Sequence, residues 1–276
     1  MLLFLAIMAY LVLVLLRPQD YPQMAGSGIP MLPLALLAAA GAWVFSRAKR
    51  FDAPQYLLLV LFYLATCVSL LVFGWVGGAQ AQFTEFMPTV VAFVLLANAV
   101  DSPSRTRTVM AVFVLSACVL ALHGIEQSVQ GVGWTGQETV EDGRIQYVGI
   151  FSDPNDLGML FVISMPMALY LGSRGGLMGL RRLWWFGGCG LLFYGVYLTN
   201  SRGAFLSLVT MTAAYLWIRK GPVLGGVLAV GALAMLKLMP SRLDQLDVSE
   251  SSASGRVDAW YEGMQMFISH PVFGVG

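Results

Sequence analysis

Long apolar stretches separated by short polar connections dominate the hydrophobic pattern of this sequence. A helix that spans a bilayer needs about 20 predominantly apolar residues, with a range of about 17 to 25. Segments close to this length recur from the N-terminus to about residue 239. They predict nine membrane-spanning helices, at Leu2–Leu16, Met31–Phe45, Tyr56–Gly77, Phe83–Val100, Thr108–Ile125, Leu157–Leu171, Leu183–Leu198, Gly203–Ile218 and Gly221–Met239.

The composition excludes a soluble globular domain. Hydrophobic residues make up 58% of the 276 residues and charged residues only 11%, and the mean hydropathy is +0.73. A soluble domain carries about 25% charged residues, because they cover its surface. The net charge of +1 also argues against a nucleic-acid-binding protein. We therefore predict an all-α, polytopic integral membrane protein.

The charges of the connections predict its orientation. Ten of the 16 Lys and Arg residues fall in four alternate connections, together with only Asp52 and Asp101 of the 15 acidic residues. Because cytoplasmic loops are enriched in Lys and Arg, this side is the cytoplasm. We expect a cytoplasmic N-terminus, a transmembrane domain over residues 1–239, and the start of a large outer loop over residues 240–276.

Arginines on the outer side run against this bias, and Arg202 is the most informative of them. It follows a very short connection, in the first turn of the helix expected at Gly203–Ile218, where Asn200 or Ser201 is the N-cap. A cation at a helix N-terminus opposes the helix dipole, unless an anion binds there to both the guanidinium and the backbone N–H groups. The alternative is an arginine that anchors to lipid headgroups. The tight connection and the small Gly203 and Ala204 favour the anion site.

A second candidate lies before the helix expected at Leu157–Leu171. Ser152 or Asp153 has the features of an N-cap, with Pro154 at the first helical position. This helix also begins on the outer side, so two helix N-termini direct their positive ends into one compartment. Arg144, in the polar loop upstream, is a weaker candidate for contact with an anion. The alternative is a solvated loop with an ordinary capping turn.

The outer tail contains a third candidate. From Val257 the apolar positions follow helical spacing, which predicts an amphipathic helix on the outer surface that ends at His270-Pro271. Arg256 lies at the predicted start, which repeats the arrangement of Arg202. Elsewhere, His123 and Glu126 form either an acid–base pair or a polar contact between helices. Because the cysteines are isolated in apolar stretches and no nucleotide-binding motif occurs, we expect neither a metal nor a cofactor.

Residues from about 140 to 276 resemble the O-antigen ligase superfamily, which includes Wzy-type polymerases and bacterial O-oligosaccharyltransferases. The resemblance rests on three motifs in a fixed order: GIFSDPN at Gly149–Asn155, LTNSRGA at Leu198–Ala204, and Arg256 with Trp260 and HPVFGVG at His270–Gly276.

The resemblance implies a multi-pass glycosyltransferase of the bacterial inner membrane, without metal or nucleotide. It would move a glycan from undecaprenyl pyrophosphate to lipid A core in lipopolysaccharide biosynthesis, to a polysaccharide or to a protein hydroxyl, on the periplasmic face. Arg202 and Arg256 would bind the pyrophosphate with Arg144, supported by Ser201, Asp153, Asn155 and Trp260. The family's catalytic histidine is expected beyond Gly276, and His270 does not match it. We therefore expect the N-terminal part of a longer enzyme, whose activity alone is an open question.

Two other functions remain as alternatives. A transporter or flippase for an anionic lipid-linked substrate would need ionisable groups near the bilayer midplane and often inverted repeats. Here the charges lie almost wholly at helix ends and no internal repeat is apparent, which favours an interfacial enzyme. A non-catalytic scaffold would tolerate the loss of both Arg202 and Arg256.

Overall fold

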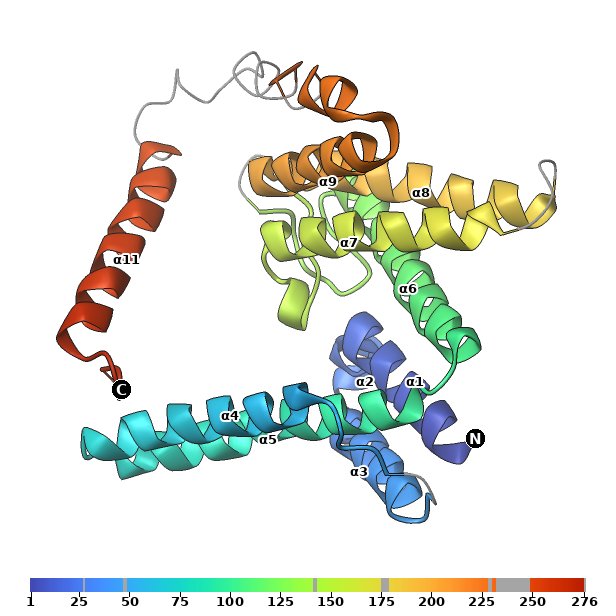
Figure 1. Ribbon diagram of the computed structural model, residues 1–276. Helices are drawn as coiled ribbons and strands as arrows, with labels where there is room; N and C mark the ends of the chain where they lie inside the picture. The colour runs from blue at the N-terminus through green and yellow to red at the C-terminus, as the bar shows by residue number, and fades with distance from the viewer. Residues whose placement is uncertain are drawn as a thin grey trace. The chain divides into compact units, whose positions relative to one another are not determined.

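The computed structural model describes residues 1–26, 28–46, 49–140, 143–174, 179–227, 230–231 and 249–275. Over these residues it is helical, and the only extended pairing consists of two isolated bridges, at residues 132/138 and 140/144. This confirms the all-α class. The elements are α1 (Leu2–Leu16), η1 (Pro18–Asp20), α2 (Pro22–Ala25), α3 (Met31–Val44), α4 (Pro54–Val72), α5 (Val76–Ala99), α6 (Pro103–Gln130), η3 (Gly149–Phe151), α7 (Pro154–Ser173), α8 (Leu180–Leu198), α9 (Arg202–Lys220) and α11 (Ser249–Ser269), as Figure 1 shows.

Five segments in the described part of the chain are long and apolar enough to cross a membrane: Leu2–Asp20, Pro54–Val72, Val76–Ala99, Pro103–Gln130 and Pro154–Ser173. Helices α3, α8 and α9 occupy three further predicted positions without adding to these five. Most of the ninth predicted segment, Gly221–Met239, lies outside the described residues.

Turn and cap residues moved several boundaries away from the predicted ones. The predicted span Tyr56–Gly77 was too long, because α4 ends at Val72 and Gly74 turns the chain with φ +77°. Helix α6 begins at Pro103, five residues before the predicted start, because Ser102 caps it and accepts a hydrogen bond from the Arg105 N–H. Turn and cap residues, as well as the length of the apolar segment, therefore set where these helices begin and end.

The chain divides into two compact units, residues 1–39 with 100–236 and residues 40–99 with 237–276. In the second unit, α4 and α5 lie side by side as a hairpin (Figure 1), with Tyr63 stacked on Phe83 at 5.2 Å between ring centroids. Near the other end of α5, the Asn98 side chain accepts a hydrogen bond from the Arg50 N–H at 2.7 Å and donates to the Arg50 carbonyl at 3.2 Å.

Helix α11 in the second unit begins earlier than predicted. It starts at Ser249 rather than Val257, so the serine-rich run is helical and Arg256 is its eighth residue. Serine costs a helix only a few tenths of a kcal/mol, and an acidic residue such as Glu250 suits the first turn. The prediction that Arg256 stands at a helix start was therefore wrong.

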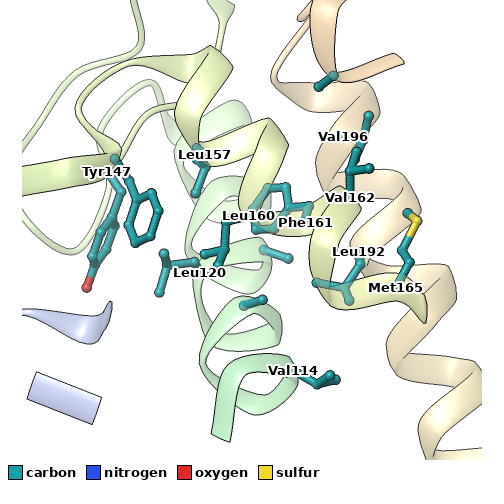
Figure 2. Packing of buried hydrophobic residues seen from close by; sticks show 14 of the residues in the cluster. Val114, Leu120, Tyr147, Leu157, Leu160, Phe161, Val162, Met165, Leu192 and Val196 are labelled. Carbon is teal, nitrogen blue, oxygen red and sulfur yellow. The ribbon is translucent and has the colours of Figure 1, made fainter. Parts of the chain in front are cut away.

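Helix α7 is the centre of the first unit. It packs against α6, α8 and α9, and Figure 2 shows Leu160 and Phe161 of α7 between Leu120 of α6 and Leu192 of α8. A Cβ at Gly195 of α8 would lie 2.8 Å from the Phe161 ring and 3.3 Å from Ala121. Small residues at such positions let helices approach closely, which is the main source of association energy within lipid.

Tyr147, at the edge of this core, joins the N-terminal segment to the rest of the first unit. Its buried hydroxyl donates to the Leu16 carbonyl and lies 2.8 Å from the Tyr21 hydroxyl. Burial raises the pKa of Tyr147 far above its ordinary value, and the hydrogen bond and charge interaction with Tyr21 raise this pKa further. The folded protein therefore keeps this hydroxyl protonated at alkaline pH.

We predict that Gly195→Leu destabilises the protein and that Gly190→Leu does not. The added side chain at residue 195 would overlap Phe161, and overpacking of this kind costs about 1–3 kcal/mol. Gly190 lies on the same helix with nothing within 4 Å of an added Cβ, so it is the matched control. Thermal unfolding in detergent measures both variants. Equal unfolding temperatures would contradict the packing described here.

We predict that Tyr147→Phe lowers the free energy of unfolding by about 1 kcal/mol at neutral pH, through loss of a buried hydrogen bond. Above about pH 10 the unfolded protein loses the Tyr147 proton while the folded protein keeps it, so stability falls as the pH rises. The variant lacks this group and should lose less stability between about pH 8 and about pH 11. An equally steep alkaline loss, measured by thermal unfolding, would count against Tyr147.

Candidate functional site

The start of α9 is built by a tight turn after α8. Asn200 adopts a positive φ of 46°, which asparagine tolerates better than most residues, and the chain reverses there. The buried Ser201 hydroxyl then accepts a hydrogen bond from the Ala204 N–H at 3.1 Å. Of the two predicted alternatives, Ser201 is therefore the N-cap. Arg202 is the first helical residue, and its side chain is exposed.

The start of α7 is also capped by a side chain. The Asp153 carboxylate accepts a hydrogen bond from the Asn155 N–H at 2.6 Å, and Pro154 is the first helical residue. Asp153 rather than Ser152 is therefore the N-cap. Asp156 is exposed in the first turn, where a carboxylate is favourable for the helix dipole.

The two helix starts lie against each other. The Ser201 hydroxyl donates to the side-chain oxygen of Asn155 at 2.7 Å, which links α9 to α7. Behind this contact, a Cβ at Gly158 of α7 would lie 2.7 Å from the Cβ of Ala204. The absence of a side chain at residue 158 therefore lets the N-termini of α7 and α9 stand together.

Arg144 completes this cluster from the preceding loop. Its Nε donates to the Thr199 carbonyl at 3.0 Å, and its Nη2 donates to the side-chain oxygen of Asn155 at 3.2 Å. Thr199 caps the C-terminus of α8, where a cation is favourable for the dipole. Arginine has five N–H donors, so the fixed, half-buried guanidinium keeps others for a ligand.

Gln127 holds the loop that carries Arg144. The sequence analysis did not single out this glutamine. Its side chain is fully buried on α6 and donates to the carbonyls of Gln137 (3.0 Å) and Glu138 (3.3 Å). Its oxygen accepts a hydrogen bond from the Gln146 N–H at 2.9 Å. Both arms of the loop are thus tied to one side chain. The available signal was a polar residue one turn after His123 on an otherwise apolar helix.

His123 and Glu126 also contact this loop. The His123 ring packs edge-on against Trp134 and Tyr147, at 5.4 and 4.9 Å between ring centroids, and Glu126 accepts a hydrogen bond from the Trp134 indole. Neither ring nitrogen of His123 has a hydrogen-bond partner in the structure. The two residues therefore form no acid–base pair, and their contacts are with a loop rather than with another helix.

Arg17 is a further arginine close to these residues. A Cβ at Gly149 would lie 2.3 Å from its guanidinium, so the glycine makes room for it beside the GIFSDPN motif. However, Arg17 forms an ion pair with Asp20 at 2.5 Å, which balances its charge. Arg202 differs, because it has no hydrogen-bond or ion-pair partner in the described part of the chain.

The structure thus brings together five of the predicted site residues in the first unit: Arg144, Asp153, Asn155, Ser201 and Arg202. Arg256 and Trp260 lie on α11 in the second unit, where Trp260 is exposed. The acidic groups of the cluster are Asp153, which is engaged as a cap, and Asp156. Two guanidinium groups beside two helix N-termini can bind a phosphate-type anion. No cluster of metal-ligating side chains occurs over the ranges that the structure describes.

Comparison with known proteins finds a similarity over the C-terminal third of the chain. Residues 187–276 match the family Wzy_C, described as O-antigen ligase, which confirms the resemblance of the sequence motifs. The matched range includes the LTNSRGA motif and α11, while GIFSDPN lies upstream and packs against it through Asn155. No curated protein and no solved structure matches the chain. The apolar helices indicate a membrane protein, and its residues 187–276 are similar to O-antigen ligases.

We predict that Gln127→Leu releases the loop that carries Arg144. Leucine fills a similar volume but leaves the Gln146 N–H without its acceptor, and an unsatisfied buried N–H costs about 1–3 kcal/mol. The carbonyls of Gln137 and Glu138 lose the Gln127 side chain but keep the Gly133 N–H and the Gln146 side chain as donors. Backbone hydrogen exchange at residues 137–140 and 143–146 should accelerate about tenfold or more. Gln130→Leu, at an exposed position on the same helix, is the control. Unchanged exchange in the Gln127 variant would mean that other contacts hold the loop.

Proposed function

Because the chain carries an O-antigen ligase domain, we propose that it is a membrane glycan transferase of the bacterial inner membrane. It takes an oligosaccharide or polysaccharide from undecaprenyl pyrophosphate on the periplasmic face. It transfers this glycan to lipid A core, to a polysaccharide or to a protein hydroxyl. The observation that supports this most directly is Arg202, which has no hydrogen-bond or ion-pair partner among the described residues. It stands at a helix N-terminus that is bonded, through Ser201 and Asn155, to a second helix N-terminus.

The cluster suits a diphosphate in charge and in shape. A diphosphate linkage carries about two negative charges, and a guanidinium binds phosphate oxygens through two parallel N–H groups. The first backbone N–H groups of a helix have no intrahelical partner. In the first turn of α9, the Ala204 N–H donates a hydrogen bond to the Ser201 hydroxyl. Arg144 is already held by two hydrogen bonds, so it loses little side-chain entropy on binding.

The reaction is a nucleophilic displacement at the anomeric carbon of the donor. The acceptor hydroxyl oxygen forms a bond to this carbon as the carbon–oxygen bond to the diphosphate breaks, and the diphosphate leaves with the electron pair. The family resemblance assigns the acceptor's proton to a histidine after the GVG turn. Negative charge grows on the leaving diphosphate in the transition state. Arg202, at the start of α9, therefore stabilises the transition state more than the ground state, which is what accelerates the reaction.

We predict that Arg202→Ala lowers glycan transfer at least about 100-fold, which is typical for loss of a group that stabilises developing charge. Membrane insertion should remain intact, because the Arg202 side chain is exposed and makes no hydrogen bond or ion pair with any residue that the structure describes. Arg219→Ala is the matched control, since Arg219 is exposed at the opposite end of the same helix. The measurement is transfer of a labelled glycan in reconstituted vesicles that contain the full-length protein.

Undiminished transfer by Arg202→Ala would contradict the assignment of the site. The same vesicles separate transfer from transport. If labelled carrier crosses the membrane and no glycosidic bond forms, the protein is a transporter for a lipid-linked substrate, and the proposed activity is wrong.

A further inference from the structure

A group of arginines lies where α7 ends and α8 begins, at the end of the helices opposite Arg202. Arg174 is the C-cap of α7, and Arg181 and Arg182 lie in the first turn of α8. Because α8 has 19 residues, its two ends lie about 28 Å apart, at about 1.5 Å per residue. This distance is close to the hydrocarbon thickness of about 30 Å. The arginines are therefore separate from the site described above.

Two of these guanidinium groups lie over aromatic rings. The Cζ of Arg174 is 5.6 Å from the centre of the Tyr170 ring, and the Cζ of Arg182 is 5.2 Å from the centre of the Phe186 ring. A guanidinium within about 6 Å of a ring centre is attracted to the ring face, which restrains it. Neither guanidinium has a hydrogen-bond or ion-pair partner among the residues that the structure describes. Both are therefore restrained and keep N–H donors for an anion.

A glycine brings the two helix ends together. A Cβ at Gly172 of α7 would lie 3.1 Å from the Cβ of Trp185 and 3.4 Å from the Phe186 ring. The ring that restrains Arg182 thus packs on the last turn of α7, two residues before Arg174. Figure 1 shows α7 and α8 side by side along their lengths. The two ring-bound guanidinium groups therefore stand at the same end of one helix pair.

The charge around these arginines is almost purely positive. Residues 157–243 contain eight Lys and Arg residues and no Asp or Glu. Asp101, which precedes α6 at this end of the first unit, is already paired with Arg105 at 2.8 Å. An anion that binds at the junction of α7 and α8 therefore meets little competition from carboxylates of the described residues.

An exposed apolar face adjoins the arginines. Leu180, Leu183 and Trp184 of α8 follow the i, i+3, i+4 spacing of one helical face, and they are 83%, 71% and 68% exposed. A soluble acidic partner would match the arginines but would leave this face in contact with water. Tryptophan and arginine at a helix end are typical of the interface between lipid and water.

We propose that Arg174 and Arg182 bind the phosphate of an anionic phospholipid, whose acyl chains cover the exposed apolar face at the start of α8. The occupant is argued from charge complementarity, because two restrained guanidinium groups match a phosphodiester and the adjacent leucines and tryptophan match its hydrocarbon. On the predicted orientation this is the cytoplasmic leaflet, whose surface potential is negative. The proposal is independent of the proposed glycan transfer.

Retention of lipid by the purified full-length protein tests this. The protein in a neutral detergent receives equal amounts of phosphatidylglycerol and phosphatidylcholine, and native mass spectrometry measures which lipid stays bound. The wild type should prefer phosphatidylglycerol. Arg174→Gln with Arg182→Gln should lower its affinity for phosphatidylglycerol about tenfold or more, because each arginine near the membrane surface contributes to binding.

The matched control is Arg219→Gln with Lys220→Gln. It removes the same number of exposed charges at the end of α9 remote from Arg202, which is the end that adjoins the start of α8 in the chain path. The control should leave the affinity for phosphatidylglycerol nearly unchanged, since neither side chain belongs to the α7–α8 junction.

Four outcomes would overturn the lipid site. The wild type could show no preference for phosphatidylglycerol, or the Arg174 and Arg182 double variant could retain it undiminished. Equal losses in this variant and in the control would show that only the net charge of this end matters. Displacement by an equal concentration of soluble glycerol 3-phosphate would show that the ligand is a free phosphate ester. Each of these results would leave the transfer measured with Arg202→Ala unaffected.

Discussion

The geometry of the cluster at the starts of α7 and α9 depends on the side-chain oxygen of Asn155. It accepts a hydrogen bond from the Ser201 hydroxyl and another from the Arg144 guanidinium. One atom thus joins the start of α7, the start of α9 and the loop that precedes α7. Each helix is also capped by its own residue, Asp153 or Ser201, so the contact joins two ends that are already formed. Shared acceptors of this kind make neighbouring hydrogen bonds depend on one another.

The packing behind this point explains why the two helix starts approach so closely. In a bilayer, helices gain little from excluding water from one another, so association depends on close van der Waals contact and on polar contacts between helices. Gly158 against Ala204 provides that contact between α7 and α9, and Gly195 against Phe161 provides it between α8 and α7. A side chain at either glycine would separate α7 from its neighbour. The packing of α7 against its neighbours therefore sets the spacing between the starts of α7 and α9.

Arg17, Arg144 and Arg202 of the first unit have three different electrostatic environments. Arg17 is paired with Asp20, and Arg144 is fixed by Thr199 and Asn155 at the negative end of α8. Arg202 stands at the positive end of α9, in an orientation that the dipole alone disfavours. A bound anion removes this conflict.

The sequence by itself determined the helical class, the positions of most helices, and the two caps to within one residue. It did so because apolar length and capping chemistry act over a few neighbouring residues. It also indicated a resemblance to the O-antigen ligase family, and residues 187–276, which include two of the three motifs, match that family. It failed at α11, where a serine run turned out to be helical, and at the break between α4 and α5, where apolar Trp75 and Val76 concealed the turn at Gly74.

Only the tertiary structure decided which polar residues meet. Gln127 is 10 to 19 residues from its loop partners, and Asn155 is 46 residues from Ser201, so no local pattern could pair them. The same holds for the close approach of Gly225 to Ala213 and Trp217, which needs the segment after α9 to fold back on that helix. These contacts depend on how neighbouring helices pack, because the hydrogen-bonding needs of a buried side chain can be met by any partner that packing brings within reach.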